Sequence, residues 1–72
     1  MDELKNQFGT RLKVLRTQKQ MTQEELAAAA QISVDFLSLI ERGRNSPSFV
    51  NLEKLAQALG VPVHELFNFD GQ

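Results

Sequence analysis

Residues 23–42 constrain the fold of this chain more than any other stretch of its sequence. The first half of the stretch contains four consecutive alanines, which favour a helix and let another backbone approach closely. The second half follows Ser33, a residue type that often caps the N-terminus of a helix. Only Gln31 and Ile32 separate the two halves. The sequence therefore predicts two short helices joined by a tight turn, with Ala27 where the helices cross.

Helical periodicity extends over nearly all of the remaining chain, which shows no strand-like alternation and no internal repeat. Thr22 and Glu25 have the spacing of a capping box, and Gly43 and Gly60 supply helix stops. We expect five helices, at about residues 6–18, 23–30, 34–41, 49–59 and 62–67. The predicted fold class is therefore a compact all-α domain of five helices.

Four of the predicted helices carry apolar residues that we expect to form one core. They are Leu4, Phe8, Leu12 and Leu15 in the first helix, Leu26, Ala27 and Ala30 in the second, Ile32, Phe36, Leu37 and Ile40 in or just before the third, and Phe49, Leu52, Leu55, Ala56 and Leu59 in the fourth.

The chain has 72 residues, so we expect one domain over residues 1–72, with its folded core at about residues 6–67. Cysteine is absent, which excludes disulfides, thiolate metal sites and thiol catalysis. The apolar stretches are too short to span a bilayer, and the first residues lack the pattern of a signal peptide. We therefore expect a cytoplasmic protein that does not contact a membrane.

The charge balance is slightly acidic, with a formal net charge of -1, which counts against binding to nucleic acid. The cations are nevertheless clustered. They are Lys5, Arg11, Lys13, Arg16 and Lys19 near the N-terminus, and Arg42 and Arg44 in the middle of the chain. A local cationic rim can hold phosphates even when the total charge is negative.

Two short helices joined by such a turn are typical of a helix-turn-helix, here at residues 23–42, whose second helix enters the major groove of DNA. Several segments also resemble the lambda-repressor-like family, which includes phage repressors, XRE-type regulators and restriction-modification controller proteins. The matching segments are Met21–Ala27, Ile32–Ser33, Leu37–Gly43, Pro47–Ser48 and Leu55–Gly60. The resemblance covers nearly the entire chain and implies a compact DNA-binding domain.

The resemblance implies three groups of DNA-contacting residues. Gln23, at the start of the second helix, would grip a phosphate together with backbone N–H groups of that helix, and the alternative is a solvated glutamine. The loop after the reading helix would contact phosphates through Arg44, Asn45 and Ser46, and Arg42 would do the same or be solvated. The base-reading positions are Ser33, Val34, Asp35, Ser38 and Leu39.

The sequence departs from the family pattern at two places. Gln31 occupies a turn position that glycine commonly fills, so it must accept a positive φ at a cost of about 1 kcal/mol. Leu39 is apolar at a position where many relatives carry a polar or basic residue, and Val34 beside it is apolar too. Apolar groups can contact thymine methyls, and Asp35 or Ser38 can bond base edges, so we expect a readout that depends on T and C and on DNA shape. The alternative is that Val34 and Leu39 face a protein partner.

The resemblance also implies an ion pair between Arg16 and Glu41, which would tie the first helix to the reading helix. The alternative is two independent surface charges. Such a pair contributes little to folding stability at the surface, but removing one partner of a buried pair lowers stability by about 3–5 kcal/mol.

No constellation of residues indicates catalysis or a metal site. His64 is the single histidine, and it has no cysteine or second imidazole to share a metal with. Glu24 and Glu25 suit the first turn of a helix, and neither a nucleophile nor a glycine-rich phosphate loop accompanies them. We expect no catalytic residue, no metal and no cofactor.

We therefore expect a DNA-binding transcriptional regulator of the repressor or controller type that binds a pseudo-palindromic operator in double-stranded DNA as a homodimer. The candidate dimer-interface residues are Val63, Leu66, Phe67 and Phe69, unless Leu66 and Phe67 close the core. Two alternatives are open. An antitoxin would bind its own promoter and a toxin protein, and a pure protein-interaction module, which the acidic balance favours, would not bind DNA.

Overall fold

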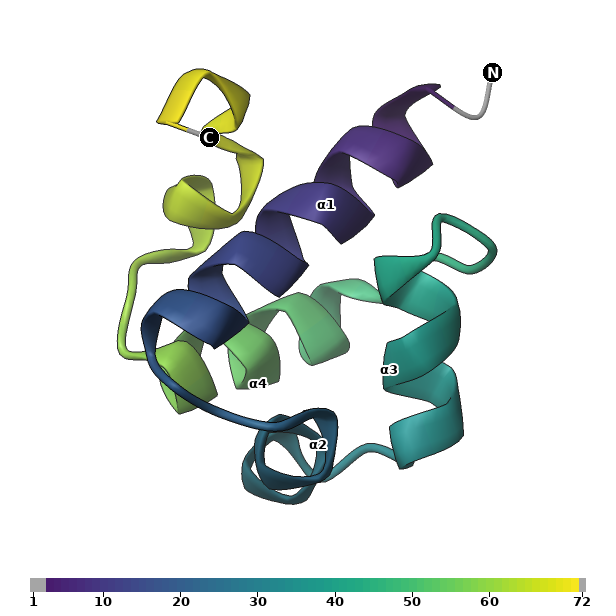
Figure 1. The fold of residues 1–72 in the computed structure, drawn as a ribbon, viewed down its shortest axis with the longest axis vertical. Coiled ribbons are helices and arrows are strands. Elements are labelled where there is room, and N and C mark those ends of the chain that lie inside the picture. Colours follow the sequence, from purple (N-terminus) through teal and green to yellow (C-terminus); the bar gives the residue numbers. More distant parts are fainter. Residues whose placement is uncertain (1–2, 72) are drawn as a thin grey trace.

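The computed structural model describes residues 3–71, and that part of the chain is helical without a β-strand (Figure 1). The α-helices are α1 (Glu3–Gln18), α2 (Gln23–Ala30), α3 (Val34–Glu41) and α4 (Phe49–Leu59). The all-α class and the first four helices are thus confirmed, although α1 begins before the expected residue 6. Residues 1, 2 and 72 of the expected domain lie outside the described residues.

The prediction of a fifth α-helix is wrong, because the chain after Pro62 forms two 3₁₀-helices, η1 (Val63–Phe67) and η2 (Phe69–Gly71). The Glu65 amide donates to the Pro62 carbonyl oxygen at 3.0 Å, which is the three-residue spacing of a 3₁₀-helix. Arg11 of α1 donates from Nε to the carbonyl oxygen of Glu65 at 2.9 Å. So short a segment does not offset the cost of starting an α-helix, and contacts with α1 stabilise the tighter turn instead.

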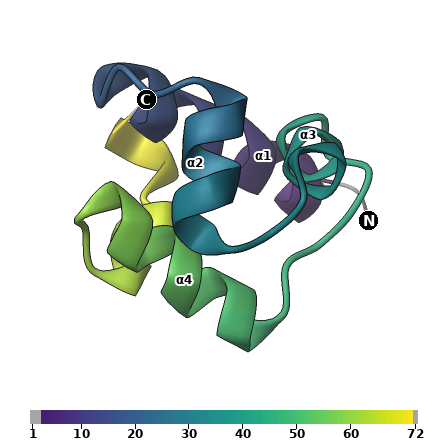
Figure 2. The ribbon, with the colours of Figure 1, turned by 90° about the horizontal axis from the view of Figure 1, so that it is seen from below.

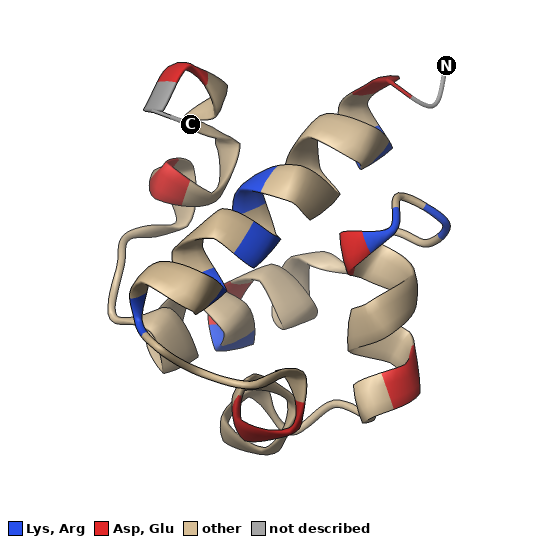
Figure 3. Ribbon diagram, in the orientation of Figure 1, with Lys and Arg blue, Asp and Glu red and all other residues tan. Residues whose placement is uncertain are grey.

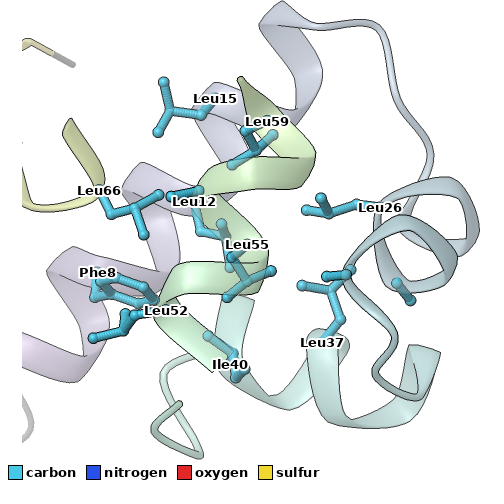
Figure 4. Close-up of a cluster of buried hydrophobic side chains, with 13 residues drawn as sticks. Phe8, Leu12, Leu15, Leu26, Leu37, Ile40, Leu52, Leu55, Leu59 and Leu66 are labelled. Atoms are coloured by element: carbon cyan, nitrogen blue, oxygen red, sulfur yellow. The ribbon is translucent and has the colours of Figure 1, made fainter. Parts of the chain in front are cut away.

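Helices α1 to α4 and η1 enclose one apolar core. α1 contacts both α3 and η1, and α2 contacts both α3 and α4 (Figures 1 and 2). Side chains from all of these elements meet between them (Figure 4). The buried apolar residues are Phe8, Leu12, Leu15, Leu26, Ala27, Ala30, Leu37, Ile40, Leu52, Leu55, Ala56, Leu59 and Leu66, and the half-buried Ile32 and Phe36 pack against them. Most of the expected core is therefore confirmed.

Leu4 and Phe49 were expected in the core, but the structure exposes them. Their exposed fractions are 56% and 86%. Each lies in the first turn of its helix. The buried apolar residues begin only further along, at Phe8 in α1 and at Leu52 in α4. The apolar periodicity of both helices continues past the edge of the core, so spacing alone did not show where burial stops.

The helices begin where their capping residues predict. The Thr22 hydroxyl accepts from the Glu25 amide at 3.0 Å, and the Glu25 carboxylate accepts from the Thr22 amide at 2.9 Å, so the capping box of α2 is complete. Ser33 and Ser48 cap α3 and α4 through their side-chain oxygens. These caps satisfy backbone N–H groups that the first turn of a helix leaves without partners.

Gly9 lies where α1 approaches the backbone of α3 closely. A Cβ atom at this position would lie 2.7 Å from the carbonyl oxygen of Glu41 and closer still to that of Ile40. Both oxygens belong to the backbone of the last turn of α3, so neither can rotate away. Glycine within a helix costs about 1 kcal/mol relative to alanine, and this close contact explains why α1 carries it.

A network of polar side chains joins α1, α2 and α3. Arg16 donates from Nε to Glu41 Oε2 at 2.7 Å and from Nη2 to Glu41 Oε1 at 3.1 Å. Its Nη1 donates to the carbonyl oxygen of Met21 at 2.8 Å, and Gln23 donates from Nε2 to Glu41 Oε1 at 2.9 Å. Arg16 and Glu41 are both buried, so the expected ion pair is present and is not a pair of independent surface charges.

Replacing Gly9 with alanine should force α1 away from α3 and lower the free energy of unfolding by about 1–3 kcal/mol, as overpacking does. Unfolding by urea, followed by circular dichroism, measures the change. The exposed neighbour Thr10 supplies the control, since Thr10→Ala should alter stability by less than about 0.5 kcal/mol. A Gly9→Ala variant as stable as the parent would contradict the close backbone contact.

The Arg16–Glu41 pair should show strong coupling in a double-mutant cycle. Arg16→Met or Glu41→Leu alone leaves one buried charge unpaired and should destabilise the fold by about 3–5 kcal/mol. The double variant removes both charges and should recover most of that loss, because apolar residues of similar size can replace a buried ion pair at little cost. Thermal unfolding of all four proteins measures the coupling, and losses that simply add would exclude it.

Candidate nucleic-acid interface

The turn between α2 and α3 is held by backbone hydrogen bonds. Gln31 adopts the left-handed conformation, with φ 60° and ψ 41°, as expected for a position that glycine commonly fills. The Gln31 amide donates to the Ala28 carbonyl oxygen at 3.2 Å, and the Ile32 amide donates to that of Ala27 at 3.0 Å. Ala27 is buried, which lets the two helices approach. The orientation of α3 relative to α2 is therefore fixed by both bonding and packing.

Four side chains form the outer face of α3, which we call the reading face. They are Asp35, Ser38, Leu39 and Arg42, the last at the helix end. Their spacing of i, i+3, i+4 and i+7 places them on one side of the helix, while the buried residues of α3 occupy the other. Asp35 and Arg42 are exposed, and Ser38 and Leu39 are half-buried.

The other two expected base readers lie at the start of α3, outside the reading face. Ser33 is exposed, and its hydroxyl accepts from the Phe36 amide at 3.0 Å, so the side chain caps the helix. Val34 is half-buried and packs against the core. Part of the Val34 side chain therefore stabilises the fold rather than facing outward.

The loop after α3 adjoins the C-terminal end of the reading face and carries cations (Figure 3). Arg42, Arg44, Asn45 and Ser46 are all exposed. Arg42 Nε donates to the Ser38 carbonyl oxygen at 3.4 Å, and the Ser46 amide donates to Asn45 Oδ1 at 2.8 Å. Gly43 turns the chain with φ 75°. The loop thus presents two guanidinium groups beside α3.

Gln23 lies at the N-terminus of α2, but its side chain is engaged within the protein. Its Nε2 donates one hydrogen bond to Glu41, the carboxylate that also binds Arg16. An amide nitrogen carries two protons, so one donor is left for another partner. The residue expected to grip phosphate is therefore held in place by the network that joins α1 to α3.

Acidic residues also surround the helix-turn-helix (Figure 3). Glu24 and Glu25 occupy the first turn of α2, and Asp35 occupies the first turn of α3. These carboxylates complement the helix dipoles and lower the positive potential near the reading face. We therefore expect a local and weak attraction for phosphates.

Among the candidate dimer-interface residues, Leu66 takes the alternative role of closing the core. Leu66 is fully buried within one chain, because η1 turns it into the core, so it closes the core instead. Val63 and Phe67 are exposed at 39% and 38%, and Phe69 is half-buried. The Phe67 ring lies 5.1 Å from that of Phe8 and 6.3 Å from that of Phe69, measured between centroids.

An exposed apolar surface, which we call the apolar patch, extends beyond the residues that sequence reasoning named. It consists of Leu4, Phe49, Val50, Val63 and Phe67. Two neighbouring pockets lie on this surface, and Phe49 and Phe67 line both of them. Phe49 was assigned to the core, and the signal that would have corrected it is its place directly after the cap residue Ser48, at the outer end of α4.

Arg11 was counted as one cation among several, but the structure gives it a specific role. Its side chain is buried and donates from Nη2 to Glu65 Oε1 at 2.9 Å, in addition to the bond from Nε to the Glu65 backbone. Arg11 therefore fastens η1, which carries Val63 and Phe67, to α1.

Within residues 3–71, no group of three or more acidic, histidine or cysteine side chains could hold a metal ion. None of the helices described is long and apolar enough to cross a membrane.

Comparison with known proteins identifies the family. A helix-turn-helix family profile matches residues 12–66. The control protein C.MunI from Mycoplasma sp is 41% identical over 69 residues, which cover 94% of this chain and 93% of that protein. The regulator DdrOP3 from Deinococcus deserti is 46% identical over 56 residues, which cover 78% of this chain and 43% of that protein.

The fold also matches that of a solved relative. The crystal structure of the restriction-modification controller protein C.AhdI from Aeromonas hydrophila matches with a TM-score of 0.86 and 41% identity, covering 88% of this chain and 96% of that one. The helices, the tight turn and these matches agree, and the chain belongs to the XRE-type helix-turn-helix family.

Proposed function

We propose that this protein is a sequence-specific DNA-binding transcriptional regulator, of the repressor or controller type, that binds a pseudo-palindromic operator as a homodimer. The observation that carries the proposal is the outward reading face of α3 beside a loop with two exposed arginines. The α2–α3 turn and the Arg16–Glu41 pair hold this face rigidly. Relatives described as control proteins and as transcriptional regulators support it.

In the proposed complex, α3 lies in the major groove, and the flanking loop binds the phosphate backbone. Arg42, Arg44, Asn45 and Ser46 supply the donors on the C-terminal side of α3. On the other side, the second N–H of the Gln23 side-chain amide donates a hydrogen bond to phosphate, together with the backbone N–H groups of the first turn of α2. Each phosphate neutralised by a cation releases counterions, so affinity falls as salt rises.

The proposed homodimer forms through the apolar patch. Phe49 is 86% exposed, and adjoining apolar residues from α1, α4 and η1 make the surface continuous. Contiguous apolar surface of this kind usually marks an interaction site, whereas single exposed apolar residues do not. Lys5 and Glu53 border the pockets and would form part of a polar rim. Two linked copies double the number of DNA contacts, which one module of this size lacks.

Arg44→Gln should weaken DNA binding uniformly across sequences and reduce the slope of log K against log salt by about 0.9, the value for one phosphate contact. Fluorescence anisotropy at several salt concentrations, on a site selected from random DNA, measures both quantities. Lys54→Gln removes the same charge from α4 and is the matched control, so its slope should equal that of the parent. An unchanged slope for Arg44→Gln would remove this residue from the interface.

Phe49→Glu should raise the dissociation constant of the homodimer at least tenfold, because a charge would enter the centre of the apolar patch. Sedimentation equilibrium over a range of concentrations measures the constant. Gln57→Glu adds the same charge at an exposed position of α4 outside the patch and should leave dimerisation unchanged. A parent chain that is monomeric at every concentration would contradict the homodimer and favour a different protein partner for the patch.

A further inference from the structure

The chemistry of the reading face is unusual for a DNA-binding surface. Residues 33–41 contain no arginine, lysine, asparagine or glutamine, so α3 itself offers no side chain for a bidentate contact with guanine or adenine. Arg42 follows at the end of the helix, with its Nε directed back to the Ser38 carbonyl oxygen at 3.4 Å. What remains on the face is one carboxylate, one hydroxyl and one aliphatic side chain.

The aliphatic side chain is that of Leu39, and its position differs from that of the other apolar residues of α3. Leu37 and Ile40 are fully buried on the opposite side of the helix, and the half-buried Val34 and Phe36 pack against the core. Leu39 is also half-buried, but it shares the reading face with Asp35 and Arg42 and is not among the residues that pack against the core. The core therefore does not require a leucine at this position.

We propose that Leu39 is a specificity-determining residue that contacts the 5-methyl group of a thymine in the major groove. The inference rests on the proposed DNA-binding function and names what this helix reads. The 5-methyl group is the apolar feature that a base pair presents in the major groove, and apolar side chains recognise it. Because 5-methylcytosine carries the same group at the same position, Leu39 also favours 5-methylcytosine over cytosine.

A protein partner accounts for the position of Leu39 less well than DNA does. The other members of the reading face are polar or charged, and the half-buried Phe36, three residues before Leu39, packs against the core. An isolated apolar residue of this kind needs no protein partner. The continuous apolar surface of the molecule is formed instead by the apolar patch, which draws its residues from α1, α4 and η1.

The test begins with selection of bound sequences from a random pool of double-stranded DNA. Each thymine in the selected half-site is then replaced with uracil, which removes only the methyl group. At one position, uracil should weaken binding about fourfold per half-site, the effect of losing one buried methyl group. At the same position, 5-methylcytosine should bind more tightly than cytosine by a similar factor.

The Leu39→Ala variant should bind the thymine site more weakly than the parent does. It should also bind the thymine and uracil sites equally. Gln57→Ala, a substitution at an exposed position of α4 away from the reading face, is the control and should keep the preference for thymine. Circular dichroism checks that both variants fold, and a Leu39→Met variant, which retains an aliphatic contact, should keep the preference as well.

The outcomes separate this inference from the proposed function. If the selection yields a bound site but no thymine in it is sensitive to uracil, or if Leu39→Ala keeps the sensitivity, the role of Leu39 is refuted while the DNA-binding function stands. If no DNA sequence is bound at any salt concentration, both are refuted.

Discussion

The bonds between Arg16 and Glu41 are the constraint on which the geometry of the site depends. They connect α1 to the last turn of α3, and the same carboxylate accepts a hydrogen bond from Gln23 at the start of α2. Three helices thus share one buried anion. Removing water from that anion is costly unless its oxygens are bonded, so the native arrangement of α1, α2 and α3 is the one that satisfies them. The close approach at Gly9 places the carbonyl oxygens of the same turn directly against α1.

Local chemistry made most of the fold predictable. Helix starts followed from the hydroxyl caps at Thr22, Ser33 and Ser48. The left-handed turn at Gln31 was instead implied by the family resemblance, in which glycine commonly fills that position. These features depend on a few neighbouring residues, which is why a single sequence discloses them. The reading face and the cationic loop followed from helical spacing together with the family resemblance.

What the sequence did not disclose depends on contacts between distant residues. The expected fifth α-helix is a short 3₁₀-helix whose Glu65 backbone is bound by Arg11, fifty-four positions away. The sequence left Leu66 open between a dimer interface and the core, which it closes, and Phe49 was expected in the core although it is exposed. Apolar spacing identifies which face of a helix can be buried, but only the packed molecule shows where that burial ends.

Two buried arginines of α1 bind opposite sides of the molecule. Arg16 binds α3, which carries the reading face, and Arg11 binds η1, which carries part of the apolar patch (Figure 1). α1 therefore fixes the distance between the surface that would meet DNA and the surface that would meet a second copy. In the proposed homodimer this distance sets the separation of the two reading helices. The number of base pairs between operator half-sites would then be determined by a helix that reads no base.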